Sequence, residues 1–169
     1  ALFLCCLYLK VKEVTIPSIT FPSVPCSIIN SGGKVKFSDL NWTGEYELAP
    51  YGIWDSALRF KKDMYHGGFQ CLSFHSKKRL AIGRGGMILT DDAEATQWFK
   101  KSRNNGREEV PLSEMKNPII GWDMYMMPEQ AARGLMLFEN IKNLDLPDLD
   151  KDKQNYPNLK HFDFYEKRD

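Results

Sequence analysis

The chain has 169 residues, a length typical of one domain with a sizeable buried core. Its 23 lysines and arginines nearly balance 22 aspartates and glutamates, which leaves a formal net charge of +1. A charge of this size attracts neither nucleic acid nor an anionic membrane. We therefore expect no nucleic-acid or membrane partner, and any anion site must be local.

Predicted strands alternate with predicted helices along most of the sequence. Apolar periodicity and turn signals predict strands at residues 13–18, 35–40, 51–56, 69–74 and 85–92. Helices are predicted at residues 1–9, at the end of 20–30, at 92–106 and at 128–144. This alternation is typical of an α/β domain with a mostly parallel sheet.

The two ends of the chain differ in composition. The apolar start, ALFLCCLYL, is too short to span a bilayer and lacks the basic beginning of a signal sequence. We interpret it as a buried helix that begins before Ala1. Residues 145–169 are rich in Asp, Lys, Pro and Asn, which predicts a linker or an incomplete structural element.

The cysteines form no CxxC or Cys/His ligand pattern, so no metal site is predicted. They lie within apolar or strand-like stretches, which favours reduced core thiols in a cytoplasmic protein. The four residues are Cys5, Cys6, Cys26 and Cys71.

The stretch SFHSKKRLAIGRGG, residues 73–86, joins a predicted strand to three consecutive bases and a glycine turn. A solvated basic corner, an anion cradle and the seat of a reactive lysine all fit this pattern. The phosphate-loop pattern GxxxxGK[ST] is absent, and the glycines lead into a strand rather than a helix. The pattern therefore disfavours a dinucleotide site.

Asp55 ends the apolar segment YGIWD, at the edge where open α/β sheets bind ligands. Capping of a following helix is the alternative role for this residue. A strand-end carboxylate and a loop lysine are two parts that a pyridoxal phosphate enzyme needs. The lysine forms a Schiff base with the cofactor, and the carboxylate keeps the pyridine nitrogen protonated.

Five segments, in order along the chain, resemble motifs of the DegT/DnrJ/EryC1/StrS family of pyridoxal-phosphate-dependent sugar aminotransferases. They are EVTIPSITFPSVPCSIINSGGKVKFSDL, IWDSA, SFHSKKRLAIGRGGMILTDD, RNNG and GWDMYMMPEQAARGL. The resemblance implies an α/β fold of the type I aminotransferase kind, with a mostly parallel sheet between helices. Residues 1–144 would be the central part of its cofactor-binding large domain, truncated at both ends. Residues 145–169 would lead toward a small C-terminal domain.

The resemblance also implies roles for single residues. Lys78 lies five residues after Ser73, as the family's cofactor-binding lysine does, and would be the catalytic acid and base. Ser73 would bind the cofactor phosphate, and Asp55 would pair with the pyridine nitrogen. Phe21 would stack on the ring, although core packing is the alternative for a phenylalanine. Asp123 occupies the place of an asparagine that reaches the phosphate from the partner subunit.

Lys77 is the second amine in this loop, and its charge would help to lower the pKa of Lys78. Adjacent residues of an extended segment point to opposite sides. We therefore expect only one of the two lysines to face the cofactor.

The implied reaction converts a keto sugar carried on a nucleotide into an amino sugar, with glutamate or glutamine as the amino donor. The implied assembly is a homodimer in which GWDMYMM faces the partner. The sequence departs from the family at Leu58, where glutamine or histidine is frequent, at Asp123, and in the short spacing between Asp39 and Asp55.

Two alternatives remain. A sugar dehydratase typically has histidine at the lysine position, so Lys78 argues against it. A non-catalytic domain could keep the fold and use its basic loop to bind an anion or a protein partner.

Overall fold

Helices and strands alternate through most of the computed structural model, which describes residues 1–165 apart from the side chains of residues 152 and 154. The helices are α1 (Leu2–Tyr8), α2 (Ser23–Asn30), α3 (Ala93–Ser102) and α4 (Pro128–Ile141). The strands are β1 (Glu13–Pro17), β2 (Lys34–Ser38), β3 (Tyr46–Leu48), β4 (Ile53–Asp55), β5 (Phe69–Ser73) and β6 (Gly86–Leu89). Short 3₁₀ turns follow at η1 (Leu112–Glu114), η2 (Asp150–Asn155), η3 (Leu159–His161) and η4 (Asp163–Tyr165).

The strands form a two-stranded sheet, β1–β2, and a four-stranded mixed sheet in the order β3–β4–β5–β6, and an isolated bridge joins the two. β1 pairs in parallel with β2, and β4 pairs in parallel with β5, whereas β3 and β6 run antiparallel to β4 and β5. Thr15 and Ala49 exchange backbone hydrogen bonds of 2.9 and 3.0 Å in an antiparallel bridge, which joins β1 to the end of β3. These pairings give β1, β2, β4 and β5 the same direction. The mostly parallel sheet is confirmed, and the carboxyl ends of these four strands lie at one edge.

Strand β3 is not predicted by the sequence pattern. It is three residues long, and alternation over so few residues does not rise above chance. The strand predicted at 51–56 is shortened to β4, because Tyr51 and Gly52 form a turn in which Gly52 has a φ of +63°. The predicted helices are all present, with ends displaced by a few residues.

Helix α1 packs on the sheet and buries Leu4, Cys5 and Cys6. The Sγ atom of Cys5 lies 3.6 Å from that of Cys71 on β5, and burial raises the pKa of Cys6 to about 12. Both features agree with protonated core thiols. The same prediction is wrong for Cys26, which is exposed on α2 because it faces away from the sheet.

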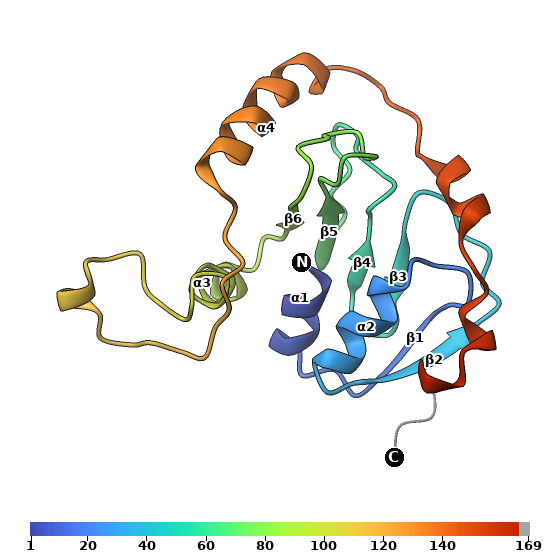
Figure 1. Cartoon of the computed structure of the whole chain (residues 1–169), viewed down its shortest axis with the longest axis horizontal. Helices are drawn as coiled ribbons and strands as arrows, with labels where there is room; N and C mark the ends of the chain where they lie inside the picture. The colour runs from blue at the N-terminus through green and yellow to red at the C-terminus, as the bar shows by residue number, and fades with distance from the viewer. Residues whose placement is uncertain (166–169) are drawn as a thin grey trace.

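Helix α4 lies at the end of the molecule near the loop between β5 and β6 (Figure 1). Leu137 and Ile141 of α4 pack against a small apolar cluster, separate from the main core, to which Ile82 of that loop belongs. The helix has 14 residues, and no helix within residues 1–165 has the length and apolarity that a membrane span requires.

Residues 147–165, here called the strap, run from the α4 end of the molecule down past β1 and β2 (Figure 1). Leu159 is 1% exposed within the main core, and its N–H donates to the carbonyl of Ser18 at 2.8 Å. The segment predicted as a linker therefore packs on the sheet as far as Tyr165. Residues 166–169 lie outside the described residues, and the small domain expected beyond them stays a prediction.

Candidate functional site

Four of the five residues singled out in the sequence lie at or just beyond the carboxyl edge of the sheet. Asp55 is the last residue of β4, and Ser73 is the last residue of the parallel neighbour β5. Lys78 lies in the loop that follows β5, and Phe21 lies between β1 and α2. The shared strand direction therefore gathers residues that are far apart in the sequence.

Asp55 is a buried carboxyl, 8% exposed. The hydroxyl of Tyr46 donates to its Oδ2 at 3.0 Å, and the backbone N–H of Ala57 donates to its Oδ1 at 3.0 Å. Burial raises the pKa of Asp55, while these two hydrogen bonds and the positive charge of Lys78 oppose the rise. The residue caps no helix, because residues 56–68 contain no helix.

Tyr46 extends the polar contacts of Asp55 toward β1. Its hydroxyl bonds to both Asp55 and the Oγ1 atom of Thr20, and both Tyr46 and Thr20 are buried. The result is a hydrogen-bonded chain from Thr20 through Tyr46 to the Asp55 carboxylate. Sequence reasoning missed both residues, and the only available signal was the alternation of Tyr46 and Leu48 around Glu47.

Lys77 and Lys78 differ in burial. Lys77 is exposed, whereas Lys78 is half-buried and its charge acts on Asp55. The expectation of an extended segment is wrong here, since the N–H of Lys78 donates to the carbonyl of His75 at 2.8 Å in a turn. The turn, rather than strand alternation, separates the two amines.

Ser73 and Phe21 complete the group at this edge. Ser73 is half-buried, and its Oγ accepts a 3.4 Å hydrogen bond from the N–H of His75. The Phe21 ring is 54% exposed, so it is not a core residue. Tyr156 of the strap meets it edge-on, with ring centroids 5.8 Å apart.

Asp123 and Leu58 stand apart from this group. Asp123 is exposed and pairs through its backbone with Asn104, next to the end of α3. Within residues 1–165 no recorded contact links Asp123 to Asp55 or Ser73. Leu58 is 2% exposed in the main core, so its side chain offers no hydrogen bond at a place where the family often has one.

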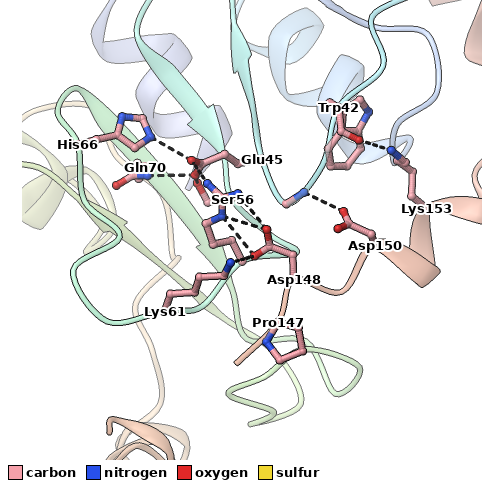
Figure 2. A network of polar contacts seen from close by, with 12 residues as sticks. Trp42, Glu45, Ser56, Lys61, His66, Gln70, Pro147, Asp148, Asp150 and Lys153 are labelled. Carbon is pink, nitrogen blue, oxygen red and sulfur yellow. Dashed lines mark hydrogen bonds and ion pairs between the residues drawn. The ribbon is translucent and has the colours of Figure 1, made fainter. Parts of the chain in front are cut away.

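A second polar cluster fastens the strap to the sheet (Figure 2). Glu45 accepts hydrogen bonds from Ser56 at 2.6 Å and Gln70 at 3.0 Å, and pairs with Arg59. Arg59 also donates to Asp148 of the strap at 2.9 Å. Burial raises the pKa of Asp148, but the hydrogen bonds and charge of Arg59 outweigh burial and leave the pKa below its ordinary value. Arg59 and Asp148 are 89 positions apart, which is why the sequence does not reveal the pair.

A hollow of about 530 Å³ lies between α1, α2 and the loop after α3, and none of its lining residues is Asp55, Ser73, Lys78 or Phe21. Its lining residues are Phe3, Ser23, Cys26, Ser27, Asn30, Trp122 and Met124. The candidate site lies at Asp55 and Lys78 instead, because that edge combines a buried carboxylate, an amine, a hydroxyl and an exposed aromatic ring. This donor set fits pyridoxal phosphate, which needs a partner for its ring nitrogen, its carbonyl carbon, its phosphate and its ring face.

Solved structures share this fold. TlmJ, an aminotransferase from Streptoalloteichus hindustanus, matches with a TM-score of 0.69 at 20% identity, over 83% of this chain and 50% of TlmJ. NtdA from Bacillus subtilis, solved with bound cofactor PMP, matches with a TM-score of 0.62 at 22% identity, over 80% of this chain and 41% of NtdA. DesI, solved in the presence of its TDP-sugar product, matches with a TM-score of 0.63 at 22% identity, over 80% of this chain and 45% of DesI.

The chain spans about half the length of the solved proteins it resembles. Their likeness confirms the fold of pyridoxal-phosphate-dependent aminotransferases. The search of curated proteins gives no significant match. The model of the DegT/DnrJ/EryC1/StrS aminotransferase family matches residues 61–146, just over half of the sequence. The chain therefore belongs to the DegT/DnrJ/EryC1/StrS aminotransferase family.

Proposed function

We propose that the complete protein is a pyridoxal-phosphate-dependent aminotransferase that acts on a keto sugar carried on a nucleotide. The observation that carries this proposal is the placement of Asp55 and Lys78 at one sheet edge, where the charge of Lys78 acts on Asp55, in a chain of this family. The PMP bound to NtdA and the TDP-sugar product of DesI support the cofactor and substrate classes.

The proposed roles follow from the chemistry of the side chains. When bound, pyridoxal phosphate supplies an electrophilic carbonyl carbon and a ring that accepts electrons. Asp55 would hold its negative charge against the protonated ring nitrogen, and Phe21 would orient the ring. The hydroxyl of Ser73 would donate to the phosphate. The Nζ atom of Lys78 would bind the cofactor covalently and, when released, would hold and transfer the proton as general base and acid.

Residues 1–144 would then form the central part of the cofactor-binding domain, and residues 145–169 would continue toward a small C-terminal domain. Asp123 would approach the phosphate of a partner subunit's site, where its charge requires it to be protonated or turned away. We propose glutamate or glutamine as the amino donor, as the family implies.

The donor half of the reaction tests this function without knowledge of the sugar. We expect the complete protein with pyridoxal phosphate to release one equivalent of 2-oxo acid from glutamate or glutamine, while the visible absorbance of the cofactor changes to that of PMP. A nucleotide-linked keto sugar should then restore the first spectrum. Failure to bind pyridoxal phosphate, or binding without 2-oxo acid release, would favour the non-catalytic alternative.

A homodimer is expected because the loop after α3 exposes apolar side chains. Met124, Tyr125 and Met127 are each about half exposed, and Trp122 and Met124 also line the hollow beside α1 and α2. Apolar surface of this kind is typical of a protein interface. A second copy of the chain is the proposed occupant.

Sedimentation equilibrium of the complete protein should show a dimer that Met124→Glu weakens by about tenfold or more, since the substitution buries a charge. Leu40→Glu is the matched control, because Leu40 is similarly exposed on another part of the surface and should leave the dimer intact. A monomeric wild type, or equal effects of the two substitutions, would contradict the proposed interface.

A further inference from the structure

The strap is fixed to the sheet on both sides of Tyr156. Before it, the backbone N–H of Gly44 donates to Asp150 at 2.8 Å, and the Lys153 ammonium lies 5.0 Å from the centre of the Trp42 ring. After it, Lys160 forms a 2.7 Å ion pair with Asp39. Asn158, next to the buried Leu159, forms an antiparallel backbone bridge with Ile19. The position of Tyr156 is therefore determined by neighbours on both sides.

Tyr156 itself meets two parts of the candidate site. Its ring lies edge-on to the half-exposed ring of Phe21, with an angle of 67° between the ring planes. This arrangement directs the positive edge of one ring to the negative face of the other, which is the favoured geometry for an aromatic pair. The contact restricts the Phe21 ring, which has no other recorded ring partner within residues 1–165.

Tyr156 also influences the Thr20–Tyr46–Asp55 chain, because its charge acts on Tyr46. Burial raises the pKa of Tyr46 well above its ordinary value, the charge of Asp55 adds to the rise, and the charge of ionised Tyr156 adds further. The phenol of Tyr156 is therefore within electrostatic reach of the phenol that donates to Asp55. One strap residue thus touches the proposed ring-stacking side chain and lies within electrostatic reach of Tyr46, the residue that donates to Asp55.

We propose that Tyr156 is a positioning residue of the candidate site, which holds the Phe21 ring in the orientation that a planar aromatic ligand requires. The inference rests on the proposed function, because the ligand in question is the pyridoxal ring. It extends that function to the strap, which the sequence predicts only as a linker. The aromatic ring of Tyr156, rather than its hydroxyl, makes the contact with Phe21. Phenylalanine at this position should therefore preserve the function, and a non-aromatic residue should not.

The test measures the affinity of the complete, cofactor-free protein for pyridoxal phosphate by quenching of tryptophan fluorescence. Tyr156→Leu should weaken binding by about 3- to 10-fold, which corresponds to the loss of one aromatic pair. Tyr156→Phe should stay within about twofold of the wild type. Phe164→Ala is the control, because Phe164 is an exposed strap aromatic whose ring contacts are with Phe162 and Tyr165, and it too should change affinity by less than about twofold.

Equal affinities of wild type and Tyr156→Leu would overturn the inference. Tighter binding by Tyr156→Leu would also overturn it, since the residue would then cover the site rather than shape it. Equal losses in Tyr156→Leu and Phe164→Ala would mean that only the docking of the strap matters. If the wild type binds no pyridoxal phosphate, the proposed function fails first, and that result is separate from all of these.

Discussion

Replacing Lys78 by alanine is expected to lower the rate of amino transfer by at least about a thousandfold. The proposed role gives Lys78 two tasks, covalent binding of the cofactor and transfer of a proton, and alanine can perform neither. Lys77→Ala is the matched control. It removes an identical side chain from the adjacent position, but that side chain is exposed, and the rate should change by less than about threefold.

The same pair of variants allows a chemical test. Pyridoxal phosphate is added to the complete protein, the adduct is reduced with borohydride, and the labelled peptide is mapped by mass spectrometry. We expect label on Lys78 that is retained in Lys77→Ala and absent from Lys78→Ala. Label on both lysines, or on neither, would show that this loop is a basic surface. That result would contradict the proposed aminotransferase function.

Asp55→Asn is expected to lower the rate of amino transfer by about 100- to 1000-fold while leaving the cofactor-free protein at least as stable as the wild type at neutral pH. Asparagine can still accept from the N–H of Ala57 and can bond the hydroxyl of Tyr46. It cannot place a negative charge beside the ring nitrogen. The variant therefore separates the electrostatic task of Asp55 from its structural one.

The stability of the two proteins should diverge with pH. Because burial raises the pKa of Asp55, the folded state holds a proton that the unfolded chain has already released. The stabilisation from this proton is complete below the unfolded-state pKa of about 4 and is lost as the pH rises through the folded-state pKa. The free energy of unfolding of Asp55→Asn, relative to wild type, should thus increase as the pH rises above about 4.

Urea unfolding of the cofactor-free proteins over a series of pH values measures this difference. Asp39→Asn provides a contrast of opposite sign, because hydrogen bonds from Lys160 and Ser18 lower the pKa of Asp39. Its stabilisation is present above the unfolded-state pKa and is lost as the pH falls. A difference between wild type and Asp55→Asn that does not change with pH would contradict the burial of an ionisable carboxyl at this position.

The sequence predicts those parts of the site that depend on local order along the chain. Asp55 and Ser73 each end an apolar strand, and parallel pairing of β4 with β5 is enough to bring them to one edge. The choice of Lys78 over Lys77 also rests on local order, because Lys78 lies five residues after Ser73, as the family's cofactor-binding lysine does. Their physical difference, however, arises from a turn that alternation along a strand does not describe.

The parts that the sequence does not predict depend on contacts between distant segments. Tyr46 reaches Asp55 from an antiparallel strand too short to show a pattern, and Tyr156 reaches Phe21 from a segment whose composition suggests a linker. The strap packs on the sheet because a few apolar side chains within its polar sequence, such as Leu159, are buried in the core. The average composition of the segment is polar, so it does not reveal the single buried residues that hold the segment on the sheet.

The anchoring of the strap has a consequence for biosynthesis. Lys160 pairs with Asp39 across 121 positions, so this contact cannot form until most of the described chain has left the ribosome. Loop closure over such a distance is also a slow step during folding. β1, α2 and β2 can assemble early with the Phe21 ring exposed, and the ring gains its Tyr156 neighbour only after the strap has been synthesised. If Phe21 stacks on the cofactor as proposed, capture of the cofactor in its final orientation would be delayed until this region has been translated.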